Sequence, residues 1–228
     1  MRLFDFGAFF IYCGFVGLLA LFYKILPGED VHGTLMRDKT RLNYAVSFFV
    51  YINSFNSNKL LALGGNSGNS IYDFMIGREL NPHIGSFDIK FFTELRPGLI
   101  GWLFINYCLA AKQFINLGYI TKSMVLVQFL QSWYVVDALW YEKALLTTMD
   151  ITTDGFGFML AFGCYSWVPF NYTLQARYLV DFPRTISWLE FGIILFVNFL
   201  GYYIFRSSNL QKNEFRENPT SKRSKRKQ

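Results

Sequence analysis

The sequence predicts an all-α protein that crosses a membrane several times. Three observations support this class: 52% of the 228 residues are hydrophobic and 20% are aromatic, the apolar residues form long runs, and no run alternates as a membrane barrel would. A backbone inside lipid must satisfy its own hydrogen bonds, so helices are the remaining way to span. We therefore expect a polytopic transmembrane helical bundle with about five to six spans or half-spans.

The first element is an apolar run from Phe6 to Tyr23, which has the length that a membrane span needs. Arg2 and Asp5 precede the run, and Lys24 follows it, where its ammonium can reach the interface. The run ends in FYKILPGED instead of the small residues of a cleavage site. We expect an uncleaved membrane anchor.

A long polar region comes next. Residues 44–55 are apolar but too short to span securely, and residues 56–97 are mostly polar. The stretch IYDFMIGRELNP within it places Arg78 near Asp73 and Glu79, which can neutralise it. We expect residues 56–97 to form a lid-like loop that such pairs fix over the bundle.

Four more apolar segments follow, separated by short connectors: Gly98–Ala111, Met124–Leu146, Phe156–Leu174 and Ile186–Phe205. We assign residues 1–205 to one transmembrane domain and residues 206–228 to a basic tail. The tail holds eight Lys or Arg and two Glu, which account for the whole formal charge of +6. Such a cluster is expected on the cytosolic side, and it also suits contact with anionic lipid or nucleic acid.

Several kinds of chemistry are disfavoured by the residue counts. The three cysteines (Cys13, Cys108 and Cys164) are odd in number, lie in apolar runs and show no metal-ligand spacing. With only His32 and His83, imidazole ligands are scarce. We expect no metal, and any catalysis must use Tyr, Asp, Glu, Lys or Arg.

Ionisable residues inside the apolar segments are the candidates for a site, because a charge at membrane depth is costly. Tyr134, Asp137 and Tyr141 are three and four residues apart, so they share one helical face. A phenol held by a carboxylate in a dry pocket can donate a proton. The alternative is that these groups only satisfy one another between helices. The further candidates are Glu142, Asp150 and Asp154.

Four long stretches, in order, resemble successive blocks of the sterol reductase family: GNSIYDFMIGRELNPHIGSFDIKFFTELRPGLIGW, YVVDALWYEKALLTTMDITTDGFGFMLAFG, WVPFNYTLQARYL and GYYIFRSSNLQKNEFRENP. This family includes the C14 sterol reductases, the lamin B receptor and, more distantly, the 7-dehydrocholesterol reductases. IYDFMIGRELNP and LTTMDITTDGFGFMLAFG are closer to the C14 branch and the lamin B receptor.

The resemblance implies a multi-pass enzyme of sterol biosynthesis in the endoplasmic reticulum membrane, or in the inner nuclear membrane as for the lamin B receptor. Such an enzyme reduces the sterol 14,15 double bond with NADPH, by protonation at C15 and hydride delivery to the cation at C14. Its partners would be the sterol and membrane lipids. The resemblance places Tyr134 near the reacting bond and Lys212 and Arg216 at the cofactor phosphates. Asp137, which shares a helical face with Tyr134, is the second expected catalytic residue. The expected substrate-pocket residues are Tyr141, Glu142, Asp150 and Asp154.

The sequence also departs from the family. The resemblance stops near Pro219, before two family blocks that complete the nicotinamide pocket, and the interval before residue 60 is shorter than in the family. We therefore expect a partial family domain that is catalytically incomplete by itself. The alternative is a non-catalytic scaffold like the lamin B receptor, or a sterol-binding membrane protein.

Overall fold

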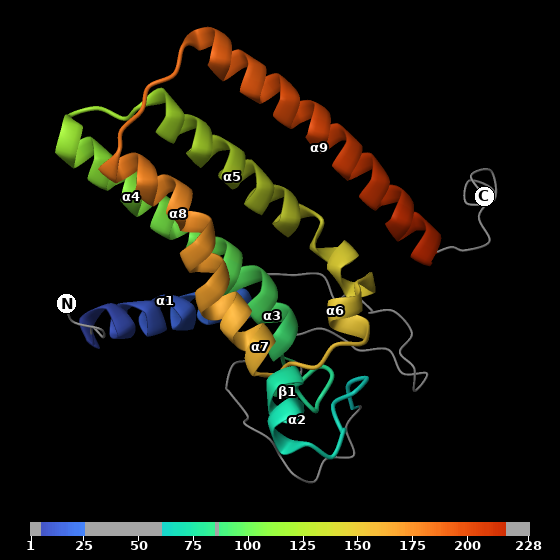
Figure 1. Ribbon diagram of the computed structural model, residues 1–228. Coiled ribbons are helices and arrows are strands. Elements are labelled where there is room, and N and C mark those ends of the chain that lie inside the picture. Colours follow the sequence, from blue (N-terminus) through green and yellow to red (C-terminus); the bar gives the residue numbers. More distant parts are fainter. Residues whose placement is uncertain (1–5, 26–60, 85–86, 218–228) are drawn as a thin grey trace. The chain divides into compact units, whose positions relative to one another are not determined.

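The computed structural model describes residues 6–25, 61–84 and 87–217, and it is mostly helical, as expected (Figure 1). The chain divides into two compact units. One comprises residues 1–102 and 148–169, and the other comprises residues 103–147 and 170–228. The expected short apolar run at 44–55 and the end of the basic tail, residues 218–228, lie outside the described residues.

The first unit contains one long helix, several short helices and a small antiparallel sheet. Its elements are α1 (Phe6–Ile25), α2 (Ser70–Ile76), β1 (His83–Ile84), β2 (Phe87–Asp88), α3 (Ile89–Leu95), α6 (Met149–Thr152) and α7 (Phe158–Phe162). Ile84 pairs with Phe87 across the sheet. Val16 and Ala20 of α1 share a buried core with Phe87 and Phe92, so apolar contact joins α1 to the segment that begins α3.

The loop around α2 packs closely against residues 153–157. The Leu63 amide donates to the Thr153 carbonyl at 3.1 Å, and the Phe156 amide donates to the Glu79 carbonyl at 3.2 Å. Gly77 ends α2 with a φ of 94°, and a Cβ there would collide with the backbone of Gly157. Only glycine satisfies both the left-handed backbone and this close approach.

Asp73 is held inside this loop by a serine. Its Oδ1 accepts hydrogen bonds from the Ser67 amide at 2.8 Å and from the Ser67 hydroxyl at 2.7 Å. These bonds, with a smaller contribution from the charge of Arg78, hold the pKa of Asp73 below its ordinary value. The Arg78 guanidinium also donates to the Asn66 side chain at 3.1 Å. The loop around α2 is thus held by hydrogen bonds from amide and hydroxyl donors as well as by charge.

Lys90 is a fully buried charge in α3. Its ammonium donates to the Asp154 carbonyl at 2.5 Å and to the Leu80 carbonyl at 3.3 Å. Nearby, the Asn81 amide group donates to the Ile151 carbonyl at 3.0 Å. These bonds connect the segments before α3 and after α6 to one internal cation, because buried carbonyls need donors.

The second unit is a group of four helices: α4 (Gly101–Leu117), α5 (Lys122–Trp140), α8 (Val168–Asp181) and α9 (Trp188–Glu217). Buried polar side chains hold three of them together. Gln131 of α5 is bonded to Asn106 of α4 and, at 2.7 Å, to Gln175 of α8. Gln113 of α4 donates to the Leu179 carbonyl of α8 at 2.6 Å. Bonds of this kind between helices replace the hydrophobic driving force that lipid removes.

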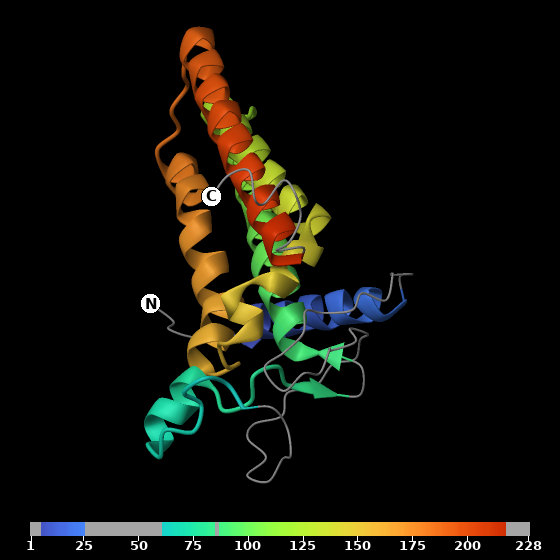
Figure 2. The same ribbon diagram turned by 90° about the vertical axis from the view of Figure 1, so that its right-hand side faces the viewer.

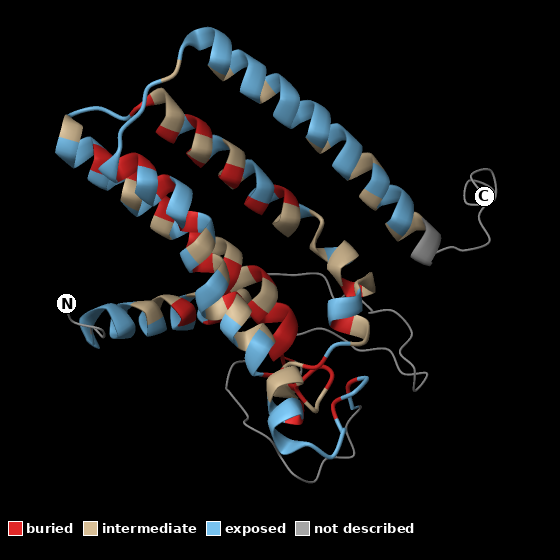
Figure 3. Ribbon diagram, viewed as in Figure 1, coloured by how far each residue is buried: buried red, intermediate tan, exposed pale blue. Residues whose placement is uncertain are grey.

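Helices α5 and α9 run side by side in the same direction (Figures 1 and 2). Their contacts keep a constant offset of 65 or 66 residues: Asp137 meets Tyr202, and Thr147, just past α5, meets Asn213. Near the other end, the Lys122 ammonium lies 4.2 Å from the ring centre of Trp188. No side chain that the structure describes on α9 is buried, which Figure 3 shows as a helix without red.

Three helical segments in the described residues are long and apolar enough to cross a membrane: Phe6–Tyr23, Ile89–Leu117 and Trp188–Glu214. The expected first span coincides with the first of these, and Gly98–Ala111 lies within the second. The last expected segment, Ile186–Phe205, overlaps the third, which continues further. The expected Met124–Leu146 span is absent from this set because α5 carries buried Gln128, Gln131 and Asp137. The described residues therefore do not confirm a count of five to six spans.

Candidate functional site

A pocket of about 410 Å³ lies between α5 and α9 in the second unit. Tyr134 and Asp137 line it from α5, and Tyr202 and Phe205 line it from α9. The three-residue spacing in each helix turns both members of each pair toward the same seam. The structure thus places the two expected catalytic residues in one pocket, whose walls are otherwise largely aromatic and aliphatic.

Asp137 is the buried acid of this pocket, with an exposed fraction of 9%. The Tyr202 hydroxyl donates a hydrogen bond to its Oδ1 at 2.8 Å, and Arg206 forms an ion pair with its Oδ2. Both oxygens of the carboxylate therefore have a partner from α9. A buried carboxylate needs such partners, because an unpaired charge is strongly unfavourable away from water.

Arg206 also contacts an aromatic ring. Its guanidinium carbon lies 3.8 Å from the ring centre of Tyr141, a cation–π arrangement. Tyr141 follows Asp137 by four residues at the end of α5, so one arginine from α9 engages two residues of the expected face. Tyr141 joins the site through Arg206.

The pocket combines aromatic rings with one carboxylate, with which Arg206 is paired. Trp133 packs edge-on against Tyr202, with ring centres 5.5 Å apart, and Phe205 adds another ring to the lining. Aromatic faces and a carboxylate both attract a cation, and they do so more strongly where water is excluded. Tyr134 is half exposed and brings its phenol group to this lining.

The remaining expected pocket residues divide between the two units. Glu142 is half-buried and begins the 3-10 turn Glu142–Thr147 in the second unit, directly after Tyr141. Asp150 in α6 and Asp154 after it are exposed and belong to the first unit. The Asp154 backbone carbonyl, rather than its carboxylate, is the group that Lys90 binds. Of the four expected pocket residues, Tyr141 and Glu142 therefore belong to the same unit as Tyr134 and Asp137.

The two residues expected at cofactor phosphates lie further along α9. Lys212 is exposed, and its neighbour Asn213 lies 3.4 Å from the Thr147 hydroxyl. The backbone of Arg216 is helical, and its four-residue spacing from Lys212 places both on one face. An exposed lysine followed one turn later by an arginine fits the charge of a dinucleotide phosphate. Among the described residues, no group of three or more His, Cys, Asp or Glu could hold a metal ion.

Tyr202 and Arg206 are the site residues that the sequence analysis missed. The expected basic tail begins at Arg206, but α9 continues past this residue to Glu217. A usable signal was present: the two residues are four apart in an apolar helix, which is the same spacing that singled out Asp137 and Tyr141.

Comparison with known proteins agrees with the resemblance found in the sequence. The sequence profile of the Ergosterol biosynthesis ERG4/ERG24 family matches residues 44–227. The Delta(14)-sterol reductase LBR of Gallus gallus is 51% identical over 218 residues, covering 87% of this chain and 34% of the relative.

Two fungal relatives show a similar match. The Delta(14)-sterol reductase erg24 of Schizosaccharomyces pombe is 56% identical over 172 residues, covering 75% of this chain and 41% of the relative. The Delta(14)-sterol reductase ERG24 of Saccharomyces cerevisiae is 42% identical over 266 residues, covering 91% of this chain and 61% of the relative. The expected likeness to the C14 branch of the sterol reductases is thereby confirmed. This chain spans between 34% and 61% of the length of these three relatives.

Proposed function

Because the chain belongs to the Ergosterol biosynthesis ERG4/ERG24 family, we propose that it takes part in the NADPH-dependent reduction of the sterol 14,15 double bond. It would do so as an oxidoreductase of sterol biosynthesis in the endoplasmic reticulum membrane or the inner nuclear membrane. The three membrane-length helices among the described residues and the names of its relatives, which are Delta(14)-sterol reductases, support this proposal. Sterol and membrane lipids would be its partners.

The observation that carries the proposal is the shared pocket of Tyr134 and Asp137. An isolated alkene is a weak base, so its protonation needs a positioned acid and a site that stabilises the cation that forms. Two phenols line this pocket: Tyr134 lies on α5 three residues before Asp137, and Tyr202 on α9 donates its proton to that carboxylate. We assign proton donation to C15 to Tyr134.

Asp137 would then act as the counter-charge and not as the acid. Arg206 pairs with it, so the group presented to the pocket is a carboxylate, which has no proton to give. A fixed carboxylate beside the rings of Trp133 and Tyr202 favours positive charge at C14. Preorganised charge of this kind lowers the barrier without reorganisation during the reaction.

The cofactor would be NADPH, which when bound supplies the hydride that completes the reduction at C14. Lys212 and Arg216 are the residues of this chain that would hold its phosphates, as their charge and spacing on α9 allow. Their contribution is binding and orientation. Proton donation would remain the role of Tyr134, and stabilisation of the cation the role of Asp137.

Sterol analysis of cells tests the proposal. Reductase-deficient cells expressing this chain, with membrane insertion confirmed by immunoblot, are given a 14,15-unsaturated sterol. Appearance of the 14,15-reduced sterol above the level in cells with an empty vector supports the reductase function. Absence of the product, with the protein inserted, assigns this chain a non-catalytic role within the family.

A second candidate function concerns the basic tail, whose eight Lys or Arg carry the formal charge of the chain. We propose that it binds an acidic surface, either anionic lipid or nucleic acid, as in a membrane scaffold. Arg206 is engaged by Asp137, so the charge available for this binding lies on the basic residues that follow it toward the C-terminus.

The chain in neutral nanodiscs should bind acidic vesicles or DNA, and changing the tail Lys and Arg after Arg206 to Gln should abolish binding. Equal binding by both forms would rule the tail out.

A further inference from the structure

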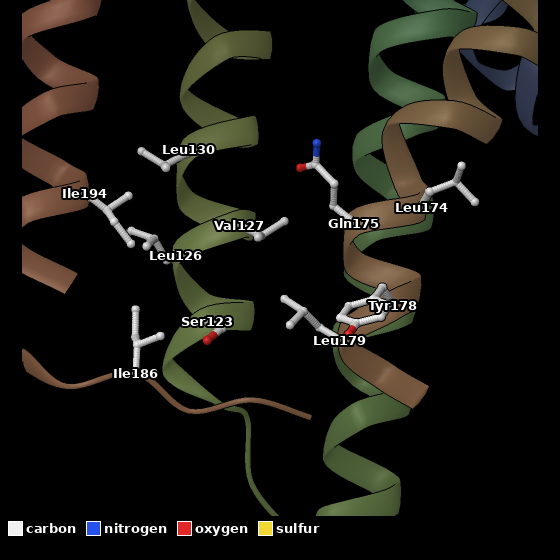
Figure 4. A pocket seen from close by; sticks show the side chains of 10 residues that line it. All are labelled: Ser123, Leu126, Val127, Leu130, Leu174, Gln175, Tyr178, Leu179, Ile186 and Ile194. Carbon is white, nitrogen blue, oxygen red and sulfur yellow. The ribbon is translucent and has the colours of Figure 1, made fainter. Parts of the chain in front are cut away.

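A second, larger hollow lies along α5 on the side of α8. It has a volume of about 620 Å³ and belongs wholly to the second unit. Figure 4 shows its side chains: Val127 of α5 and Leu179 of α8 extend toward one another, whereas Leu126 and Leu130 of α5 extend toward Ile194 of α9. We call it the α5–α8 groove. Its principal aliphatic lining residues are Leu126, Val127, Leu130, Leu174, Leu179 and Ile194.

The groove adjoins the pocket of Tyr134 and Asp137. Leu130 lines both hollows, and on α9 the lining passes from Ile194 in the groove to Val197 in the pocket. Along α5, eight residues separate Leu126 from Tyr134, which is about 12 Å at the helical rise of 1.5 Å per residue. One elongated molecule can therefore occupy both hollows at once.

The two hollows differ in chemistry. The pocket contains Asp137, Tyr134 and Tyr202, whereas seven of the ten residues that line the groove are Leu, Val or Ile, the others being Ser123, Gln175 and Tyr178. Its amide side chain, Gln175, has its carbonyl oxygen bonded to Gln131 at 2.7 Å, so that acceptor is engaged within the protein. The groove thus offers mainly dispersion contacts and apolar burial.

We infer that the α5–α8 groove binds the branched alkyl side chain of the sterol substrate while the ring double bond lies at the pocket of Tyr134 and Asp137. This inference rests on the proposed function, and it adds the orientation of the substrate and the groove residues that select its side chain. The alkyl end of the sterol is placed in the groove, and its hydroxyl end away from it, because most of the lining is aliphatic. The alkyl chain matches the apolar character of most of the lining.

Photolabelling tests the orientation. Two 14,15-unsaturated sterol probes are used, one with a diazirine at the end of the alkyl chain and one with a diazirine on ring A. Membranes containing the chain are irradiated, and the labelled peptides are mapped by mass spectrometry. The alkyl-chain probe should label residues 123–130 or 174–179, and excess unlabelled 14,15-unsaturated sterol should prevent it. The ring-A probe should leave these residues unlabelled.

A matched pair of variants makes the test specific. Val127→Phe fills the groove, whereas Val125→Phe adds the same ring on an exposed face of the same helix. Val127→Phe should reduce groove labelling by the alkyl-chain probe about tenfold, the scale on which apolar pockets discriminate. Val125→Phe should leave it unchanged. A sterol with a shortened side chain should compete equally well for binding to both variants.

Several outcomes would overturn the inference. Groove labelling by the ring-A probe would reverse the orientation. Labelling by a photoreactive phosphatidylcholine that sterol does not displace would make the groove a lipid acyl-chain site. If no groove labelling is prevented by unlabelled sterol, the groove does not bind sterol. Turnover measured on the same membranes separates the two proposals: turnover without groove labelling rejects only the orientation, and competed groove labelling without turnover rejects only the reductase function.

Discussion

The Tyr202 hydroxyl donates a 2.8 Å hydrogen bond to the Asp137 carboxylate, across a separation of 65 residues in the sequence. The next turn of α9 supplies Arg206, which pairs with the other oxygen. This arrangement defines Asp137 as an anion fixed at the α5–α9 seam. Tyr202 and Tyr134 both line the pocket, and the hydroxyl of Tyr202 is the one bonded to the carboxylate.

Tyr134→Phe should lower formation of the 14,15-reduced sterol about a hundredfold or more, because a positioned general acid contributes on that scale. Sterol profiles from reductase-deficient cells, normalised to membrane-inserted protein, measure the change. Tyr203→Phe is the matched control, since Tyr203 is exposed on α9 and does not line the pocket. Full turnover by the Tyr134 variant would exclude this phenol as the acid.

The Asp137–Arg206 pair should show strong coupling in stability. Asp137→Asn or Arg206→Met alone should cost about 3–5 kcal/mol, because each leaves one partly buried charge without its partner. The double variant should recover most of that loss. Unfolding temperatures of the solubilised protein give the comparison, and additive losses in the double variant would contradict the coupling.

Gly77→Ala should destabilise the loop that packs on residues 153–157. The substitution imposes the left-handed strain of a φ of 94° and drives a Cβ into the Gly157 backbone. Gly68→Ala is the control in the same loop, because its φ is 85° but nothing lies within 4 Å of an added Cβ. Gly68→Ala should cost about 1–2 kcal/mol, from left-handed strain alone. Gly77→Ala should cost more, and equal losses of thermal stability would argue against the close contact.

The α2 loop should lose protection at acid pH. Because Ser67 lowers the pKa of Asp73, the stabilisation is complete above the ordinary pKa of aspartate, about 3.9, and is lost as the pH falls through the lower folded value. Hydrogen exchange of residues 61–80, corrected for intrinsic rates, should follow that loss. Ser67→Ala should move the loss to higher pH, and Asp73→Asn should remove the pH dependence. An unchanged profile in Ser67→Ala would show that another group controls the loop.

The helical class, the first membrane-length segment and the family were all accessible from the sequence. Apolar run length reports the cost of leaving a backbone in lipid, so Phe6–Tyr23 is recognisable without any partner. The common face of Tyr134 and Asp137 was also accessible, because helical periodicity is local. The span expected at Met124–Leu146 was a weaker prediction, since the buried glutamines of α5 face other helices and not lipid.

The partners of those residues were decided only by the tertiary structure. Nothing near Asp137 in the sequence identifies Tyr202 and Arg206 as its donors, and nothing near Lys90 identifies the Asp154 carbonyl as its acceptor. A sequence pattern specifies which residues share a face, because that depends on the chain's own period. Which face packs against which depends on the free energy of contacts between distant segments, and that is settled only when the helices assemble.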